Sequence, residues 1–281
     1  MTSAVVFAYH DVGVRCLQVL LEAKVSVPLV VTHRDDPKER VFFGSVAELA
    51  RRSGIEALED AGEEQLRTRL EQLKPDFIFS FYYRRMLPVA FLAAAKRGAY
   101  NMHGSLLPKY RGRAPVNWAI LRGETETGAT LHEMVAKPDA GRIVDQERVA
   151  IGPDETAGEV MAKVSAAAET VMRRALPALI AGTAKLHAQD LAAGSYFGGR
   201  RPDDGRIDWS KSAREIHNLV RAVAPPYPGA FTESLRVFKT RLEPGKTTSR
   251  KGPYQESGEW FAGCGDGKVL RLLEVEPLPN K

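Results

Sequence analysis

An amide and an imidazole two residues apart are the first side chains in this sequence that could act together. Asn101 and His103 alternate on an extended stretch, so both would project to the same face. An asparagine amide can donate to a developing oxyanion, and a histidine can donate or shuttle a proton. The glycine and proline in 104–108 turn the chain away and leave the pair at a strand end, where α/β sheets bind ligands. A satisfied structural histidine beside a turn asparagine is the alternative interpretation.

A carboxylate that could partner the histidine lies further along the chain. Asp139 stands in a Pro-Asp-Ala-Gly turn, where an aspartate often serves only the turn itself. Beside a histidine, the same carboxylate would raise the imidazole pKa and fix the ring tautomer. The three side chains together could stabilise an oxyanion and move a proton. No metal-ligand spacing is present, so we expect no metal site.

Short apolar strands that alternate with helices must position these residues. We expect buried strands at 5–8, 27–32 and 77–80, a turn at 9–13, and helices over 17–23 and around 46–50. This alternation predicts an α/β fold with a Rossmann-like, mostly parallel sheet and helices on both faces. The GxGxxG fingerprint is absent after the first strand, which disfavours a nucleotide-cofactor oxidoreductase.

The second half of the chain predicts a change of architecture. A long amphipathic helix is expected over 156–181, kinked or split by Pro177, followed by a connection at 192–208. Ser212 and Glu215 form a capping box for another helix. Short strands are expected at 229–231, 236–240, 259–263 and 269–275, with a polar, mobile loop at 247–257. We therefore expect a catalytic domain over 1–198 and a small β-rich, OB-like domain over 199–281.

Composition limits the classes of partner. The chain has 281 residues with 40 Lys plus Arg and 35 Asp plus Glu, a net charge of +5. That excess suits a small anionic substrate and is too weak to imply nucleic acid. Cys16 and Cys264 have no paired spacing. With no leader and no apolar run of about 18 residues, we expect a cytoplasmic protein without a membrane span; a homo-oligomer is compatible with the sequence.

Several motifs together resemble the folate-dependent formyltransferase family. They are Asn101-Met102-His103, Ser105-Leu106-Leu107-Pro108, His132-x-Met134 and Asp139-x-Gly141. Further segments resemble the branch that formylates UDP-4-amino-4-deoxy-L-arabinose for lipid A modification and polymyxin resistance. They lie at 7–11, 80–84, 109–115, 123–128, 202–204, 217–223 and 228–231. The likeness covers most of the chain and fades after about Thr232.

The resemblance implies a role for each matching residue. Catalysis would belong to Asn101, His103 and Asp139, with a protonated His103 stabilising the oxyanion and Asp139 keeping it charged. The formyl donor would be 10-formyltetrahydrofolate, bound by Arg85, Met86, Leu87, Arg113, Val135, Ala136, Lys137, Pro138 and Asp139, mostly through the backbone. The nucleotide sugar would meet Tyr9, His10 and Arg113. Departures from the branch at Arg85, Met86 and Pro88 are ones that backbone recognition tolerates.

The acceptor that the resemblance implies is the 4-amine of a UDP-linked amino sugar. Methionyl-tRNA is a rival acceptor, although residues 33–39 are short and mixed in charge where the tRNA branch carries a basic insertion. Arg113 also stands where that branch usually has a small residue. Another nucleotide sugar, a purine-synthesis ribonucleotide and a non-catalytic folate-binding module are three further hypotheses. We expect no oxidative decarboxylase domain of the kind that is fused to the best-known relative, because the chain has no room for one.

Overall fold

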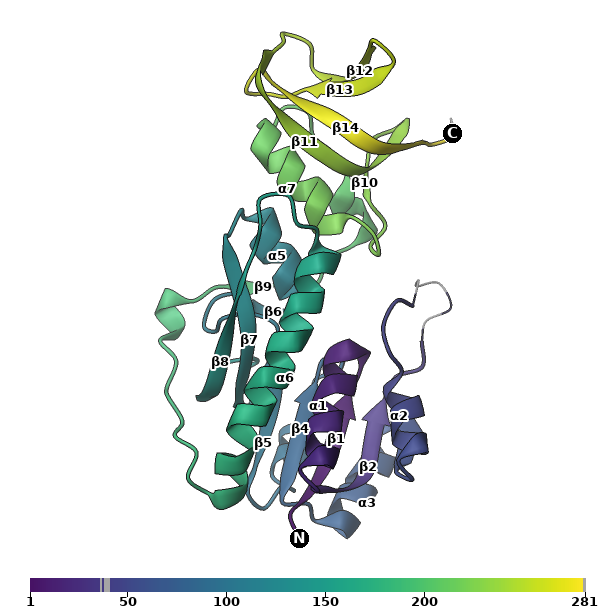
Figure 1. Ribbon diagram of the computed structural model, residues 1–281. Helices are drawn as coiled ribbons and strands as arrows, with labels where there is room; N and C mark the ends of the chain where they lie inside the picture. The colour runs from purple at the N-terminus through teal and green to yellow at the C-terminus, as the bar shows by residue number, and fades with distance from the viewer. Residues whose placement is uncertain (36, 38–40, 280–281) are drawn as a thin grey trace. The chain divides into compact units, whose positions relative to one another are not determined.

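The computed structural model describes residues 1–35, 37 and 41–279, which form two compact units (Figure 1). The first unit consists of Met1–Gly112, Gly128–Val149 and Lys163–Tyr196. The second consists of Arg113–Thr127, Ala150–Ala162 and the chain from Phe197 onward. Neither unit is one continuous stretch of sequence. The domain division at 198 and 199 stays a prediction.

A seven-stranded sheet forms the centre of the first unit, in the order β3-β2-β1-β4-β5-β7-β8. Strands β1 to β5 pair in parallel, and β7 runs antiparallel to β5. The strands are β1 (Ser3–Ala8), β2 (Ser26–Thr32), β3 (Glu56–Glu59), β4 (Phe77–Phe81), β5 (Gly98–His103), β7 (Glu126–Glu133) and β8 (Ile143–Ala150). The predicted Rossmann-like, mostly parallel sheet is confirmed.

Helices cover both faces of this sheet, as expected. They are α1 (His10–Glu22), α2 (Val46–Arg52), α3 (Glu63–Leu73), α4 (Val89–Leu92) and the long α6 (Ala157–Ala181). Figure 1 shows α1 and α6 side by side on one face. A core cluster joins Leu66 and Leu70 of α3 and Phe91 of α4 to Val5 and Phe7 of β1. Both faces of the strands are therefore buried, which explains their uninterrupted apolar runs.

One helical prediction was wrong in detail, and in a second the expected split of a helix was wrong. Helix α1 begins at His10 rather than after a turn at 9–13, because the turn is confined to Tyr9, which is extended, and His10, whose φ is 66°. Helix α6 runs without a break through Pro177. A proline removes one backbone hydrogen bond of its helix. The fully buried neighbours Val171 and Leu176 hold the flanking turns in place by packing.

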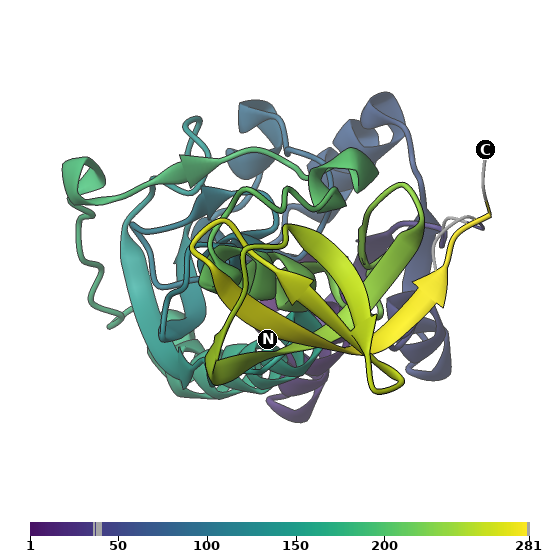
Figure 2. The same cartoon turned by 90° about the horizontal axis from the view of Figure 1, so that it is seen from above.

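The second unit combines two helices, α5 (Pro115–Leu121) and α7 (Ala213–Val223), with an antiparallel sheet. Its strands follow the order β10-β11-β14-β13-β12 and pack on α7 (Figure 2). They are β10 (Ala230–Phe231), β11 (Leu235–Thr247), β12 (Gly252–Glu256), β13 (Glu259–Gly263) and β14 (Lys268–Pro277). The remaining short elements of the described chain, in either unit, are β6 (Arg111–Gly112), β9 (Tyr196–Phe197) and 3₁₀ turns at Leu191–Ala193 and Pro202–Gly205. The predicted capping box opens α7: Ser212 Oγ accepts from the Glu215 backbone, and Glu215 accepts from the Ser212 backbone.

The expectation of a loop over 247–257 was partly wrong, since only residues 248–251 and 257 lie outside strands. The segment contains β12, which pairs along its whole length with β13. Tyr254 stacks against Phe261 at 5.9 Å between ring centroids, and this contact orders one face of β12. Within the 33–39 segment used to judge the tRNA acceptor, residues 36, 38 and 39 lie outside the described part. No helix that the structure describes has both the length and the apolar character to cross a membrane.

Candidate active site

The expected site segments share one edge of the sheet. The register aligns Ala8 of β1, Phe81 of β4 and Met102 of β5 in a row across three neighbouring strands. The next residues are Tyr9 and Tyr82, which begin the connections after β1 and β4, and His103, which is the last residue of β5. Strands β1, β4 and β5 are parallel, so these are carboxyl ends, where open α/β sheets bind ligands. The structure therefore brings together the segments that sequence analysis selected at 9–10, 85–87 and 101–103.

Asn101, His103 and Asp139 lie in one cluster, joined by His132. His103 is buried, with Nε2 2.8 Å from the carbonyl oxygen of Tyr110 and Nδ1 3.6 Å from Asp139 Oδ1. His132 Nε2 lies 3.4 Å from the same Oδ1 and 3.2 Å from Asn101 Nδ2. The three predicted catalytic residues thus converge as expected.

His132 is the residue of this cluster that sequence reasoning did not assign a role. It stands directly opposite Asn101 in the antiparallel pair of β5 and β7. Its Nδ1 is 2.7 Å from the Glu133 carbonyl oxygen, which can only accept, so Nδ1 carries the proton. In the neutral ring Nε2 is then the acceptor, and the Asn101 amide donates to it. This contact uses one N–H of the Asn101 amide, and the second N–H could donate to a ligand.

The turn that carries Asp139 is held by its neighbours. Asp139 has a φ of 51°, a left-handed conformation that aspartate tolerates better than most residues. Its Oδ2 accepts from the Gly112 N–H at 2.8 Å, and Gln189 Nε2 donates to the carbonyl oxygens of Asp139 and Gly141. A Cβ on Gly141 would lie 2.0 Å from the Glu133 carbonyl oxygen. Only glycine allows this close approach, which explains the Asp-x-Gly spacing.

Burial decides the protonation of His103. It lowers the pKa of the imidazole, and although Asp139 and the Tyr110 carbonyl oppose it, the net direction is downward. For Asp139, burial works against ionisation. The positive charge that His103 can carry and the Gly112 N–H outweigh it, so the pKa of Asp139 is well below its ordinary value. The resting pair at neutral pH is an ionised Asp139 beside a neutral His103. The expectation that Asp139 keeps His103 charged is corrected: burial outweighs the carboxylate.

The two loops expected to hold the folate present backbone and apolar surface. Met86 is 65% exposed and Val135 is 41% exposed, which is unusual for side chains of this type. The chain neighbours Leu87 and Met134 pack against the same core cluster, so both loops start from one support. Arg85 donates to Asp60 Oδ1 at 3.3 Å. Ala136 and Lys137 are exposed and Pro138 is half-buried.

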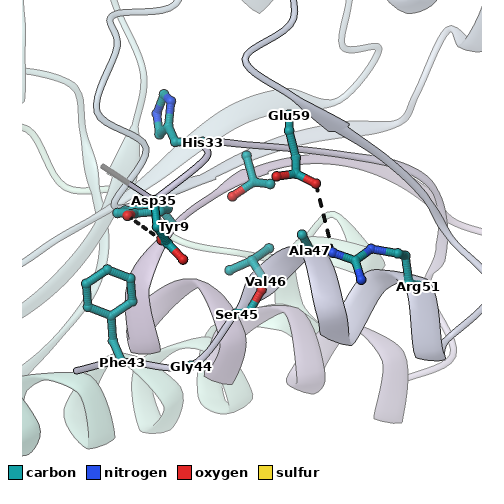
Figure 3. Close-up of a pocket in the computed structure, with 11 residues that line it drawn as sticks. Tyr9, His33, Asp35, Phe43, Gly44, Ser45, Val46, Ala47, Arg51 and Glu59 are labelled. Carbon is teal, nitrogen blue, oxygen red and sulfur yellow. Dashed lines mark hydrogen bonds and ion pairs between the residues drawn. The ribbon is translucent and has the colours of Figure 1, made fainter. Parts of the chain in front are cut away.

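Tyr9 and His10 lie at the start of α1. Tyr9 donates its hydroxyl to Asp35 Oδ1 at 2.7 Å and lines a pocket at the ends of β1 to β3 (Figure 3). On the far side of that pocket Arg51 faces Glu59 at 3.9 Å (Figure 3). The His10 ring lies 4.3 Å from the Phe43 ring, and its Nδ1 is buried with no hydrogen-bond partner in the described chain. Burial lowers the pKa of His10.

Arg113 belongs to the second unit, although it follows Gly112 directly in the chain. Its side chain is exposed and its N–H donates to the Phe197 carbonyl oxygen at 3.0 Å. Sequence reasoning predicted a ligand contact for this guanidinium, and that contact stays a prediction.

Comparisons with known proteins identify the family and the fold. A formyl transferase family model matches residues 10–176, and a model of the formyl transferase C-terminal domain matches residues 200–281. Among solved structures, an N-formyltransferase from Helicobacter canadensis in complex with folinic acid and dTDP-3-aminofucose has a TM-score of 0.79 at 22% identity, covering 99% of this chain and 100% of its own. WlaRD, a sugar 3N-formyl transferase solved in the presence of dTDP and 5-N-formyl-THF, has a TM-score of 0.76 at 20% identity, with 100% and 99% covered.

A third solved structure shares the fold within a longer chain. HypX from Aquifex aeolicus in complex with tetrahydrofolic acid has a TM-score of 0.65 at 18% identity, covering 98% of this chain and 45% of HypX. At these identities the solved structures establish the fold, whereas the family model spans more than half of the sequence. This chain belongs to the formyl transferase family.

Proposed function

We propose that this protein transfers a formyl group from 10-formyltetrahydrofolate to the amine of a nucleotide-linked amino sugar. The observation that carries the proposal is the cluster of Asn101, His132, His103 and Asp139 at the carboxyl end of β5 in a formyl transferase family member. Asn101 is hydrogen-bonded to His132, and Asp139 lies 3.6 Å from His103 and 3.4 Å from His132. The Helicobacter canadensis relative was solved with folinic acid and a dTDP-linked amino sugar, which supports both the donor and the class of acceptor.

The finer proposal is the 4-amine of UDP-4-amino-4-deoxy-L-arabinose, a step of lipid A modification and polymyxin resistance. Its support is the sequence resemblance, including Arg113 and the segments around residues 80–84 and 202–204. A dTDP-linked amino sugar is the second candidate, because two structural relatives were solved with dTDP or a dTDP sugar. The two candidates share the reaction and differ in the base and the position of the amine.

The two loops suit a pterin. A flat, partly polar ring needs apolar contacts for its faces and backbone groups for its edge. Met86 and Val135 are exposed apolar side chains, and the neighbouring residues Arg85 and Ala136 are exposed as well. When bound, 10-formyltetrahydrofolate supplies an amide-type formyl carbon as the electrophile. The residues of this chain bind it, orient the formyl oxygen and handle the proton.

Asn101 stabilises the charge that develops on the formyl oxygen. One of its two amide hydrogens is held by His132, and the second is directed to the oxygen. A preorganised donor of this kind typically contributes on the order of a hundred- to a thousand-fold in rate. Since the orientation of the amide is set before substrate binds, little reorganisation is needed during the reaction.

His103 moves the proton. It is neutral at rest, so Nδ1 can accept the proton of the attacking amine as the new C–N bond forms, directly or through one water. The imidazolium then lies beside the ionised Asp139, which stabilises it. His103 returns the proton to the folate nitrogen as the original C–N bond breaks. The proton taken from the amine and the proton given to the leaving group are therefore balanced within one residue.

A panel of acceptors tests the proposal. UDP-, dTDP- and GDP-linked amino sugars are incubated with 10-formyltetrahydrofolate, and formylated product is identified by mass spectrometry. A matched thermal-shift series with a stable folate analogue reports binding alone, because a ligand specific for the folded state raises the melting temperature. Formylation of a nucleotide sugar is expected. Formylation of none of them, with active folate-bound protein, contradicts the proposal.

A further inference from the structure

An aromatic stack in the second unit holds a guanidinium in place. The rings of Trp118 and Phe197 stack with centroids 4.9 Å apart and planes 25° apart. The guanidinium carbon of Arg200 lies 5.0 Å above the Trp118 ring, a cation–π distance. Trp118 donates its indole N–H to the Gly198 carbonyl oxygen at 3.0 Å, and Arg113 donates its backbone N–H to Phe197 at the same distance. Residues 197–200 are thereby fixed against α5.

Two guanidiniums, those of Arg113 and Arg200, lie in this region. Among the described residues no carboxylate lies within ion-pair distance of either one. The Arg200 side chain donates to the Asp204 backbone carbonyl at 2.9 Å. The Arg113 side chain lies along Gly199, where an added Cβ would be 3.5 Å from Arg113 Cδ. Gly199 precedes Arg200, so the backbone beside the Arg113 side chain leads directly into the second arginine.

The guanidiniums of Arg113 and Arg200 pack against the protein without an ion-pair partner among the residues that the structure describes, which leaves them able to bind an anion. A guanidinium on an aromatic face keeps most of its N–H donors directed outward, and its fork geometry matches phosphate oxygens. Other arginines of this protein are used differently: Arg142 binds Glu133 through two nitrogens, and Arg174 bridges Asp145 and Glu147. Arg113 and Arg200 have the same chemistry, but within the described part of the chain neither has a carboxylate within ion-pair distance, and the charge of Asp204 acts on Arg200 from farther away.

We propose that Arg113 and Arg200 form an anion subsite that binds the diphosphate of the nucleotide-sugar acceptor, with the Trp118–Phe197 stack as its rigid support. This inference rests on the proposed function. Arg113 follows Gly112, whose N–H is held by Asp139, so one backbone segment carries both a contact of the catalytic cluster and the first arginine of the subsite. Two guanidiniums suit two linked phosphate groups better than one carboxylate. The folate glutamate is the other anion in this reaction, and the test separates the two.

Four variants test the subsite: Arg113→Gln, Arg200→Gln, Arg200→Lys and, as the control, Arg122→Gln. Arg122 packs over Phe197, the other ring of the stack, at 5.6 Å. Its removal takes one charge and one cation–π contact from the same structure without touching the proposed subsite. Melting temperatures identify any variant that fails to fold. The measurements are the inhibition constants of UDP and dTDP against the sugar nucleotide, and KM for both substrates.

Arg113→Gln and Arg200→Gln should each raise KM for the nucleotide sugar and the inhibition constant of the nucleoside diphosphate by about ten-fold or more. KM for the folate and kcat should change much less. For Arg200→Lys both constants should lie between those of the wild type and Arg200→Gln, because the lysine ammonium keeps the charge but lacks the planar fork of the guanidinium. The constants of Arg122→Gln should resemble those of the wild type.

Three results would contradict the subsite or the function on which it rests. An unchanged KM for the nucleotide sugar in folded Arg200→Gln overturns the subsite while leaving the proposed function intact. A rise confined to the folate KM assigns the arginines to the folate and also overturns the subsite. Failure of the wild-type protein to use any nucleotide sugar overturns the proposed function instead, and the subsite with it.

Discussion

At the scale of single residues, the distinctive feature is the orientation of the Asn101 amide by His132. The cross-strand pair connects a residue that sequence analysis selected to one it left without a role. The spacing of residues along β5 could identify Asn101 and His103. No rule of spacing could show that β7 pairs with β5 in the register that places His132 opposite Asn101, because that register depends on the tertiary fold.

The first prediction is a coupling between these two residues. His132→Gln should lower kcat by about ten-fold with little change in KM, since the hydrogen bond from Asn101 to His132 orients the amide. Asn101→Ala should cost roughly a hundred-fold or more. If His132 works through Asn101, the double variant should be no slower than Asn101→Ala alone. Steady-state kinetics of the four proteins measures this, and independent, multiplying losses would contradict the orienting role.

The second prediction concerns pH and stability. The folded pKa of His103 is lowered from 6.5, so below about pH 6.5 the unfolded chain binds more protons than the folded protein. Stability is therefore present above that pH and lost as pH falls toward the folded pKa, with a slope of up to about 1.4 kcal/mol per pH unit for each such histidine. His10, His33 and His217, whose pKa values burial also lowers, should add to the effect.

Urea unfolding between about pH 5 and pH 8 tests this linkage. The free energy of unfolding of the wild type should fall on acidification. That of His103→Gln should fall less steeply, because the variant has one fewer histidine that takes up a proton on unfolding. His187→Gln is the matched control, since the side chain of that histidine is exposed. Equal slopes for wild type and His103→Gln would show that burial does not lower the His103 pKa.

At the scale of elements, apolar runs and local chemistry identified β1, β2, β4 and β13 and the capping box of α7. Each of these signals is contained within its own segment. Two elements that were predicted wrongly, β12 and α6, depend on contacts with other segments. Strand β12 was expected to be a loop because its sequence is polar. It is a strand because it pairs with β13, which its own composition does not show. The continuity of α6 through Pro177 likewise depends on packing that the local rule omits.

The turn between β7 and β8 gives the third prediction. Gly141→Ala would place a Cβ 2.0 Å from the Glu133 carbonyl oxygen, so the backbone must move. We expect a loss of about 2–3 kcal/mol in the free energy of unfolding and, because Asp139 moves with the turn, a fall in kcat of at least about ten-fold. Gly62→Ala, at a position with no atom within 4 Å of the added Cβ, is the control. A Gly141→Ala protein as stable and active as the control would refute the requirement for glycine at this turn.

At the scale of the whole molecule, the chain contributes separated segments to each unit. Within the second unit, Asn117 of α5 donates to the Ala222 carbonyl oxygen, and Arg221 donates to the carbonyl oxygens of Gly152 and Glu155. The change of composition near residue 198 predicts one boundary between residues 198 and 199. Local sequence patterns cannot show that the chain enters a unit more than once. The β-rich character of the C-terminal segment was predictable; its partnership with 113–127 and 150–162 was not.

The fourth prediction follows from those contacts. A fragment of residues 1–198 loses α7 and leaves the buried Asn117 side chain of α5 without its acceptor. The fragment should be less stable than the full chain and should expose apolar surface, detected by a lower melting temperature and by binding of a hydrophobic dye. In the full chain, Arg221→Ala should cost about 2–4 kcal/mol, because it leaves two carbonyls without a charged donor. A fragment that melts like the full protein would indicate an independent catalytic domain.

The class of acceptor distinguishes this proposal from the rival members of the same family, and a comparison of three acceptors decides it. With 10-formyltetrahydrofolate as donor, kcat/KM is measured for a UDP-linked 4-amino sugar, a dTDP-linked amino sugar and charged initiator tRNA on the same preparation of wild-type protein. We expect a nucleotide sugar to be formylated at least about ten-fold more efficiently than the tRNA. If initiator tRNA is the better substrate, the sugar assignment is wrong, even though Asn101, His103 and Asp139 still carry the reaction.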